Sequence, residues 1–517
     1  MQSLKAFSIY AKKVIGISDS YAIKANAVAM GFDERLMVEN AGSSVATALL
    51  HKHRRRRILF VCGIGGKGGI GLAAARHLLE IPDIDVSIAL VGNESMMHNP
   101  ITKFNYHLLD EITEINEFGE ENIDKLRELV RDSEVVVEAL IGIGLKGKLY
   151  GIMARAIKII NESKKHVTCI DIPAGIDGDT GMPNTVSIKP THVLTIHRLK
   201  TGIEKSHLIS STTIEKIGIP LSAELMTGPG DIMLAAEHRS LEANKYTHGS
   251  VLVLGGSPEF KTAPLLSAYT VNIVTASLRT GAGYATLVHP SGLPARLDEQ
   301  SLNIPMRTMK GKTLSNEDLP MIESIKHNTL VIGEGMADER TSYRAISTLV
   351  KHERDRGNIT VVDATAIRAL SRNKGIFGKN SILTPHYGEF KVLSGIDLSN
   401  SGTRSRINTA INFAKDNNCV LVLKGHETII TDGDLLKINE PATPALATMG
   451  TGDVLSGIIA GFASFHRNAF ESAAAGVYLH SKIADLLAIE SGNHILATDV
   501  MSGIPKVLKM YDSMTRV

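Results

Sequence analysis

The sequence predicts an α/β protein of two successive domains, each with its own mainly parallel sheet. Short β-branched apolar runs alternate with longer helical patterns along most of the chain, and the alternation restarts after a break near residue 220. The length of 517 residues also exceeds what one compact core normally holds. We therefore expect a doubly wound domain over residues 1–220 and a three-layer α/β/α domain over residues 221–517.

The first domain contains five apolar runs that we interpret as strands. Runs without polar alternation are typical of strands buried on both faces, and the helical patterns between them indicate parallel crossovers. A Rossmann-like sheet is the arrangement that fits. The runs are ILFVCG at 58–63, DVSIALVG at 85–92, SEVVVEAL at 133–140, HVTCIDIP at 166–173 and HVLTIH at 192–197.

The second domain follows a glycine- and proline-containing stretch at 221–246 and repeats the pattern. Two further strand-like pieces, 427–433 and 435–440, are separated from their neighbours only by short turns, so we expect an antiparallel edge there. The earlier runs are VLVLGG at 251–256, YATLVHP at 284–290, TLVIGEG at 329–335, NITVVDAT at 358–365, SILTPH at 381–386 and CVLVLKG at 419–425.

Composition narrows the class of protein. Lys and Arg total 56 against 54 Asp and Glu, so no large field attracts nucleic acid or an anionic membrane. No apolar run is long enough for a membrane span, and residues 1–29 lack the features of a signal peptide. The three cysteines are too far apart to suggest a zinc site or a disulfide framework, and we expect them to be buried. These features favour a cytoplasmic protein without nucleic-acid or membrane partners.

The segment ATMGTGDVLSGIIAGF at 447–462 is the most informative one. Its apolar residues follow helical spacing, so the glycine-rich turn at 450–452 opens a buried helix. Free N–H groups and the helix dipole favour an anion such as phosphate at that end. Asp453 stands beside this anion site. It is either an N-terminal cap or a general base that accepts the proton of an attacking hydroxyl.

Several motifs resemble the ribokinase-like superfamily, and more narrowly the NAD(P)H-hydrate dehydratases. The resemblance covers residues 240–517 and implies a ribokinase-like fold that dehydrates NADHX or NADPHX, the hydrated cofactors, using ADP or ATP. The motifs are GGSPEFKTAP at 255–264, RTGAGYATL at 279–287, VIGEGM at 331–336, VVDATA at 361–366, TPHYGEF at 384–390, LKGHETII at 423–430 and TMGTGDVLSGIIAG at 448–461.

The resemblance also implies residue roles. Asp453 becomes the catalytic base, and Glu389 holds a magnesium-bound water. On the residues alone, His386 is an ordinary loop histidine and 424–428 a hairpin turn. Thr365 and Thr262 depart from the family pattern, and Thr365, two residues after Asp363, puts a charge-based role there in doubt. The implied ligand contacts are Ala263, Gly335, His386 and Asp453 for the hydrate, and Lys424, Gly425, His426, Glu427, Thr428, Gly450, Thr451 and Gly452 for the nucleotide.

Residues 15–220 resemble the NAD(P)H-hydrate epimerases, through LMVENAG at 36–42, CGIGGKGGIG at 62–71, EALIGIGLKG at 138–147 and DIPAGIDGDTG at 171–181. Asp171 matches the candidate acid–base residue that inverts the hydrated carbon; its other reading is an Asx cap of the following turn. The implied substrate contacts are Asp171, Gly66, Lys67, Gly68, Gly69, Ile70, Gly142, Ile143, Gly144, Leu145, Lys146, Gly147 and Lys148.

The potassium ligands of the epimerase family are altered in this chain. Lys67 and Ala174 stand at ligand positions and supply no ligand, and Glu138 replaces an aspartate. We predict that no potassium binds and that the Lys67 ammonium pairs with Glu138 in its place. The alternative is a lysine exposed in a glycine turn.

Two other functions fit the same residues. A ribokinase-like kinase of a small alcohol or vitamin precursor would use the same aspartate and anion site, with a first domain that only binds nucleotide. The first domain could also be a scaffold without catalytic activity. Whether the chain is a repair enzyme or a kinase, its size favours a homo-oligomer.

Overall fold

The computed structural model describes residues 4–52, 56–144, 147–236, 242, 244–245, 248–256, 263–292, 304–373, 375–441 and 443–513, with side chains from Asn272 onward in the helix that begins at Ala263. The chain divides at residue 220, where we placed the domain boundary, into two compact units. One spans residues 12–220. The other joins the residues after 220 to those before 12, which the sequence had assigned to the first domain. The reason is burial: Phe7 and Ala11 lie in the same hydrophobic core as Leu225 and Leu319.

The N-terminal unit, residues 12–220, contains a parallel sheet in the order β4-β3-β2-β5-β6-β7-β9. From β2 the chain adds strands outward to β4, and from β5 it adds them outward on the opposite side to β9. This change in the order of the strands makes it a doubly wound sheet, as predicted. A short pair, β1 with β8, accompanies it. The strands are β1 (Val14–Ile15), β2 (Arg57–Gly63), β3 (Asp85–Val91), β4 (Ile115–Phe118), β5 (Val135–Ala139), β6 (His166–Ile170), β7 (His192–Ile196), β8 (Leu199–Lys200) and β9 (Thr212–Glu215).

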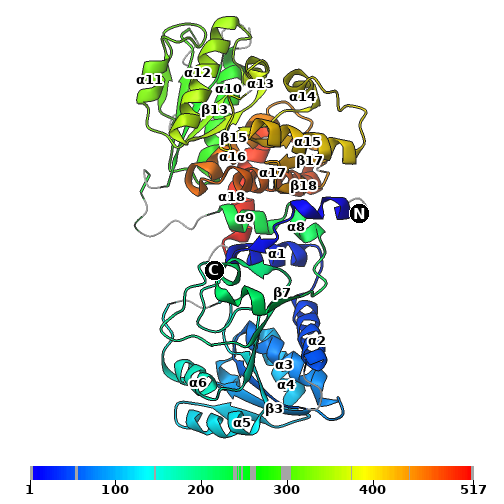
Figure 1. Cartoon of the computed structure of the whole chain (residues 1–517). Coiled ribbons are helices and arrows are strands. Elements are labelled where there is room, and N and C mark those ends of the chain that lie inside the picture. The colour runs from blue at the N-terminus through cyan, green and yellow to red at the C-terminus, as the bar shows by residue number, and fades with distance from the viewer. Residues whose placement is uncertain are drawn as a thin grey trace. The chain divides into compact units, whose positions relative to one another are not determined.

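Helices cover both faces of this sheet (Figure 1). Leu59 and Val61 of β2 share a core with residues of α5 and α6, whereas Cys62 faces α3. A Cβ on Gly71 of α3 would lie 2.5 Å from that of Ala139, so this glycine permits close helix–sheet packing. The helices are α1 (Ile17–Ala29), α2 (Glu34–Lys52), α3 (Gly66–Leu79), α4 (Pro100–Asp110), α5 (Leu126–Asp132), α6 (Gly151–Glu162) and α7 (Thr201–Glu204), with 3₁₀ turns η2 (Glu94–Met96), η3 (Ile123–Lys125) and η4 (His207–Ser211).

The C-terminal unit contains a larger sheet in the order β12-β11-β10-β13-β14-β15-β16-β17-β18. It is parallel from β12 to β16, and β17 and β18 form the predicted antiparallel edge. The strands are β10 (Ser250–Leu254), β11 (Tyr284–His289), β12 (Met306–Thr308), β13 (Thr329–Ile332), β14 (Ile359–Val362), β15 (Ser381–Leu383), β16 (Val420–Leu423), β17 (Thr428–Thr431) and β18 (Leu436–Asn439).

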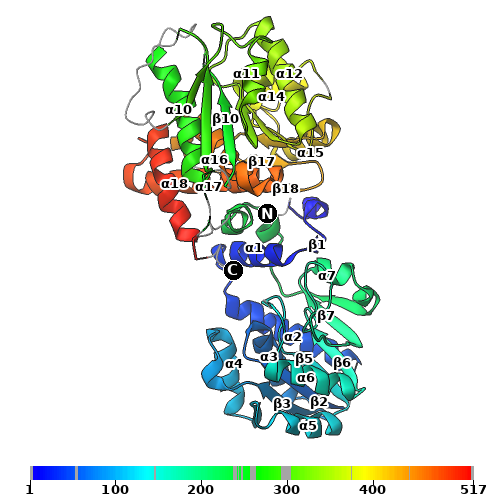
Figure 2. The same cartoon turned by 90° about the vertical axis from the view of Figure 1, so that its left-hand side faces the viewer.

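Two helical layers enclose this sheet, which gives the predicted α/β/α arrangement (Figure 2). Helices α11 to α15 share a core with one face, and α10, α16 and α17 share a core with the other. The helices are α8 (Ser222–Leu225), α9 (Pro229–Ala235), α10 (Ala263–Thr280), α11 (Leu319–Ser324), α12 (Arg340–Arg356), α13 (Ala364–Leu370), α14 (Tyr387–Ser394), α15 (Thr403–Asn417), α16 (Thr451–His466), α17 (Ala469–Ser491) and α18 (Ala497–Tyr511), with η1 (Leu4–Tyr10) and η5 (Pro444–Leu446).

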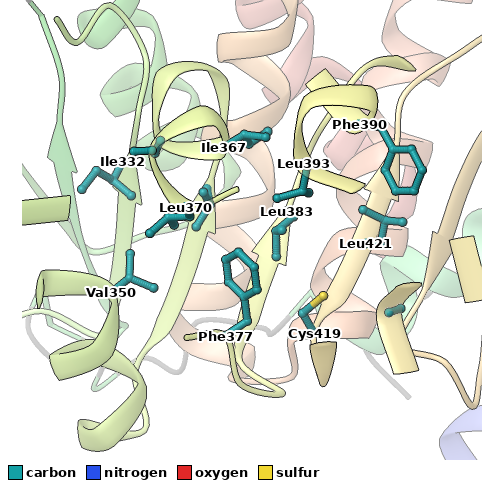
Figure 3. Close-up of a cluster of buried hydrophobic side chains, with 14 of the residues drawn as sticks. Ile332, Val350, Ile367, Leu370, Phe377, Leu383, Phe390, Leu393, Cys419 and Leu421 are labelled. Carbon is teal, nitrogen blue, oxygen red and sulfur yellow. The ribbon is translucent and has the colours of Figure 1, made fainter. Parts of the chain in front are cut away.

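The core between β13–β16 and the first helical layer fixes the loops that follow these strands. Ile332, Leu383 and Leu421 project from the sheet toward helix residues such as Ile367 and Phe390 (Figure 3). The neighbouring strand residues contribute to the opposite core, as expected of strands buried on both faces. The three cysteines are buried and free, as predicted. None of the described helices has the length and apolar character needed to cross a membrane.

Candidate active sites

The first candidate site lies at the carboxyl edge of the C-terminal sheet. The loops after β10, β13, β14, β15 and β16 meet at this edge because the strands are parallel. Hydrogen bonds join neighbouring loops: Gly256 N–H donates to Glu334 O at 3.1 Å, and Thr365 Oγ1 donates to Met336 O at 3.1 Å. The residues predicted from the sequence at Gly335, Asp363, His386 and Lys424 all occupy these loops.

The glycine turn before α16 presents an open helix N-terminus. Gly450 precedes the helix with φ +90°, a conformation that favours glycine, and no side chain caps the helix. Thr451 Oγ1 turns away from the first-turn amides and donates to Leu446 O and Thr448 O, both at 2.8 Å. Thr451 N–H donates to Thr448 O at 3.4 Å, and the N–H groups of Gly452 and Asp453 remain available for an anion.

Asp453 is the third residue of α16 and does not act as its cap. Within the described residues its carboxylate has no hydrogen bond or ion pair. Burial raises the pKa of Asp453 to about 7, with a further increase from Asp363 and an opposing effect of Lys424. A carboxyl group with this pKa exchanges a proton easily near neutral pH, as a general base must.

Lys424 supplies positive charge beside this turn. Its Nζ lies 3.1 and 3.3 Å from the two Asp363 carboxylate oxygens, and a Cβ on Gly452 would lie 3.7 Å from the same nitrogen. Burial tends to lower the pKa of Lys424, but Asp363, Glu389 and Glu334 outweigh it and raise that pKa. Ser456 Oγ donates to Asp363 at 3.0 Å. An ammonium ion is therefore held next to the open helix end.

Glu334 was not anticipated from the sequence. The residue is 2% exposed, and both carboxylate oxygens are buried without a hydrogen-bond partner in the described structure. Burial, followed by Asp363 and Asp453, raises the pKa of Glu334 well above its ordinary value. It precedes Gly335, whose φ is +65°. The available signal was an acidic residue in the apolar segment VIGEGM, directly after a buried strand.

His386 and Glu389 form a reciprocal cap at the start of α14. His386 Nδ1 accepts the N–H groups of Gly388 and Glu389 at 3.0 and 3.2 Å, and Glu389 Oε2 accepts His386 N–H at 3.0 Å. The ordinary hydrogen-bonding role considered for His386 is therefore present. The imidazole is still 61% exposed, so the other side of the ring is accessible to a ligand.

Residues 424–428 form the hairpin between β16 and β17. A Cβ on Gly425 would lie 2.1 Å from Tyr387 Oη, so a larger residue here would displace that tyrosine. Glu427 accepts a hydrogen bond from Thr403 at 2.8 Å. Nucleotide binding by this hairpin stays a prediction. Thr262 and the side chain of Ala263 lie outside the described residues; the backbone of Ala263 begins α10.

The second candidate site is a cleft of about 490 Å³ in the N-terminal unit. It lies where the order of the parallel strands changes side, between β2 and β5. Ligands of doubly wound proteins bind at such a switch point. Seven of the residues predicted from the sequence line the cleft: Gly66, Lys67, Ile70, Gly142, Ile143, Gly144 and Asp171.

The other predicted contacts of this site do not line the cleft. Gly68 and Gly69 pack against the protein, since a Cβ would lie 1.8 Å from Gly63 O and 2.7 Å from Thr102 Oγ1, respectively. Both glycines are required by packing, and their contact with the substrate stays a prediction. Gly147 and Lys148 are exposed outside the cleft lining. Leu145 and Lys146 lie outside the described residues.

Lys67 makes the predicted ion pair with Glu138. Its Nζ lies 2.7 and 2.8 Å from the carboxylate oxygens and also donates to Ile172 O at 2.7 Å and Ile141 O at 3.3 Å. The side chains are 6% and 0% exposed, which excludes the alternative of a lysine exposed in a turn. Ala174 contributes only its N–H, which donates to Glu138 at 3.1 Å. A potassium ion does not fit these residues, because the ammonium already occupies the oxygen-lined position.

Asp171 lies at the end of β6 with φ +60°. Its Oδ1 accepts from Thr195 Oγ1 at 3.2 Å and Ile196 N at 3.1 Å, and pairs with Lys200 Nζ at 2.7 Å. These partners come from β7 and β8 rather than from the turn after Asp171, so the Asx-cap interpretation is not supported. Sequence reasoning missed Lys200, although a lysine after the apolar run HVLTIH was a usable signal.

Comparison with known proteins matches both units. Residues 251–506 match the family described as NAD(P)H-hydrate dehydratase, and residues 34–202 match the family described as YjeF-related protein N-terminus. The bifunctional NAD(P)H-hydrate repair enzyme Nnr of Pyrobaculum aerophilum is 30% identical, with 95% of this chain and 97% of the relative covered. The chain belongs to the family of bifunctional NAD(P)H-hydrate repair enzymes.

A second member of the family and a solved structure are also similar to this chain. The enzyme of Methanopyrus kandleri is 32% identical, with 94% of this chain and 95% of that protein covered. The crystal structure of ADP/ATP-dependent NAD(P)H-hydrate dehydratase from Bacillus subtilis, co-crystallised with ATP and Mg²⁺, is 23% identical, covers 56% of this chain and 99% of its own, and has a TM-score of 0.47. Family membership confirms the resemblance inferred from the sequence motifs and the assignment as an enzyme.

Proposed function

We propose that this chain repairs hydrated NADH and NADPH with two activities. The C-terminal unit dehydrates NADHX and NADPHX at the expense of ADP or ATP, and the N-terminal unit interconverts the R and S hydrates. The observation that carries the first activity is Asp453, an unpaired carboxylate with a raised pKa at an open helix N-terminus beside Lys424.

In the dehydratase reaction, Asp453 takes the proton from the added hydroxyl while that oxygen forms a bond to the terminal phosphorus of the nucleotide. The bond from phosphorus to the leaving nucleotide oxygen breaks, and the amides of residues 450–452 with Lys424 stabilise the charge on the transferring group. The phosphate then leaves with the electrons of its carbon–oxygen bond. Loss of a ring proton restores the reduced nicotinamide.

The remaining contacts of the dehydratase site are assigned from the motifs shared with the family. Gly335, Ala263 and the exposed ring of His386 would contact the hydrate, and residues 424–428 the nucleotide. Magnesium would join through the nucleotide phosphates and a water on Glu389, since this cation retains much of its hydration. The described residues contain no cluster of three metal-ligating side chains, so the phosphates would have to supply most of the binding.

In the epimerase reaction, Asp171 would act as the acid–base residue that inverts the hydrated carbon. It would donate a proton to the departing hydroxyl, which leaves as water, and accept a proton from the water that adds to the opposite face of the ring. The side chain of Lys200 and the amide of Ile196 hold one carboxylate oxygen, which fixes the orientation of Asp171 toward the cleft. We expect Asp171→Asn to reduce interconversion to near the spontaneous rate. An unchanged rate would reject this assignment.

A turnover assay with the full chain tests the proposed function. Purified R and S forms of NADHX and NADPHX are incubated with ADP or ATP, and the absorbance of the reduced nicotinamide and the release of phosphate are followed. We expect both signals to rise together. A stable phosphorylated product without recovered absorbance would instead identify a small-molecule kinase.

We place this enzyme in the cytoplasm as a homo-oligomer, with small-molecule substrates as its only ligands. The near-neutral net charge and the free buried cysteines support a reducing compartment without an anionic partner. Light scattering after size exclusion measures the assembly, and a monomer would contradict this part of the proposal.

A further inference from the structure

The Lys67 ammonium occupies a complete oxygen shell. Two carboxylate oxygens of Glu138 and the carbonyl oxygens of Ile141 and Ile172 surround Nζ at 2.7 to 3.3 Å. An ammonium has three N–H donors, and the shell offers an acceptor to each of them. The position therefore has the ligands and the net charge of a site for a monovalent cation, with the cation supplied by the protein.

Glu138 is also fully used. Its Oε1 accepts Leu140 N–H at 2.7 Å and its Oε2 accepts Ala174 N–H at 3.1 Å, in addition to the two contacts with Lys67. One carboxylate and one ammonium leave the shell electrically neutral. A second cation would find neither a vacant oxygen nor an unbalanced negative charge.

The shell connects the loops that form the cleft. Lys67 is the second residue of α3 after β2, Glu138 and Ile141 belong to the end of β5 and its loop, and Ile172 follows β6. Gly142 packs on the lysine stem, since its Cβ would lie 3.3 Å from Lys67 Cδ. The loops on both sides of the switch point are thus held together through one nitrogen atom.

We propose that the Lys67 ammonium is a built-in monovalent cation that makes the N-terminal unit independent of potassium. Removing the amine should turn the same shell into a potassium site, because a buried carboxylate and two carbonyl oxygens would remain without a cation. The proposal rests on the proposed function only in so far as the cleft is where the hydrates are epimerised. The cation itself is argued from the contacts of Lys67.

The test compares the wild-type chain with Lys67→Asn, which is shorter and replaces the ammonium with an amide oxygen. Hydrogen exchange of residues 138–144 and 172–174 is measured in potassium, sodium and choline chloride at equal ionic strength. We expect the wild type to exchange equally in all three salts. In Lys67→Asn, potassium at about ten times its dissociation constant should slow exchange by about tenfold relative to choline.

Lys67→Met is the matched control, because it keeps the stem against Gly142 and fills the position of the amine without charge. We expect it to exchange faster than the wild type in every salt, with no preference among cations. Slower exchange of the wild type in potassium than in choline would overturn the proposal. So would a Lys67→Asn variant that responds to potassium no more than Lys67→Met does.

A third measurement applies if neither variant folds. Epimerisation by the wild-type chain is then followed in potassium and in choline; equal rates support the proposal, and stimulation by potassium overturns it. Hydrogen exchange needs no substrate, so it separates this inference from the proposed function. A potassium-dependent Lys67→Asn in a chain that fails to epimerise the hydrates would reject the epimerase activity and leave the built-in cation standing.

Discussion

Each unit of this enzyme holds a lysine–carboxylate pair at the carboxyl edge of its parallel sheet. The first pair is saturated, meaning that every carboxylate oxygen has a hydrogen-bond partner and the charges balance, and the second is not. Around Lys67, every oxygen of Glu138 is used and the charges cancel. Around Lys424, one ammonium faces Asp363 together with two further carboxyl groups, those of Asp453 and Glu334, that have no hydrogen-bond partner in the described residues.

The difference separates a structural use of charge from a reactive one. The saturated pair of Lys67 and Glu138 holds the loops of the cleft in place. At the unsaturated cluster, burial and then the neighbouring Asp363 raise the pKa of Asp453 to about 7, which makes proton transfer possible at physiological pH. The same residue types therefore serve different purposes in the two units, because Glu138 is fully paired and Asp453 is buried without a partner in the described residues.

The largest effect is expected at Asp453. Replacing it with asparagine keeps the size and removes the base, so dehydration should fall by about 100- to 10,000-fold. Nucleotide affinity, measured by calorimetry, should be largely retained because the amides and Lys424 remain. Asp434→Asn, in an exposed turn, serves as a control that should leave turnover unchanged. Normal turnover by Asp453→Asn would remove the proposed base.

The role of the saturated pair, Lys67 with Glu138, is tested by measuring the free energy of unfolding rather than turnover. Lys67→Met leaves Glu138 buried and unpaired, which should lower the free energy of unfolding of the N-terminal unit by about 3–5 kcal/mol. Lys391→Met breaks an exposed pair with Asp397, which solvent screens, and should lower the free energy of unfolding far less. The double variant Lys67→Met with Glu138→Gln should recover stability. Equal costs at Lys67 and Lys391 would show that the buried pair has no special role.

The pH dependence of dehydration reports the unsaturated cluster. Asp453 acts as a base only when ionised, so the rate should fall by about tenfold for each pH unit well below its pKa of about 7 and level off above it. Asp363→Asn removes a carboxylate that raises this pKa, so the midpoint should move to lower pH. A midpoint that stays in place after this substitution would exclude Asp363 as a cause.

Glu334 should give the smallest effect, on stability. Its pKa is raised in the folded state, so folding holds a proton that the unfolded chain releases, and the wild type loses stability as pH rises from the ordinary glutamate range toward the raised pKa. Glu334→Gln removes this loss. The variant should gain relative to wild type by up to about 1.4 kcal/mol per pH unit in that range. A pH-independent difference in denaturation would contradict it.

The sequence predicted those features that depend on local pattern. Long apolar runs such as 58–63 and 420–423 identified the buried strands, and motif substitutions at residues 67 and 138 predicted an ion pair between positions 71 residues apart. The sequence did not predict β9 and β12, because they are short, partly exposed edge strands without a long apolar run.

Contacts between separate loops explain what the sequence could not give. The partnership of Asp171 with Lys200 depends on how β6 and β8 are placed, and the isolation of Glu334 depends on what surrounds it in three dimensions. Neither follows from spacing along the chain. Gly68 and Gly69 are also required by packing, which a motif interpretation of these glycines did not anticipate.

The participation of η1 in the C-terminal core means that one unit is nested within the other along the polypeptide. A ribosome releases Phe7 first and the strands it must join only after more than two hundred further residues. The apolar residues of η1 therefore have no core to join while residues 12–220 are synthesised. A fragment cut at Leu221 would lack that aromatic ring, so its poor solubility would say nothing about catalysis.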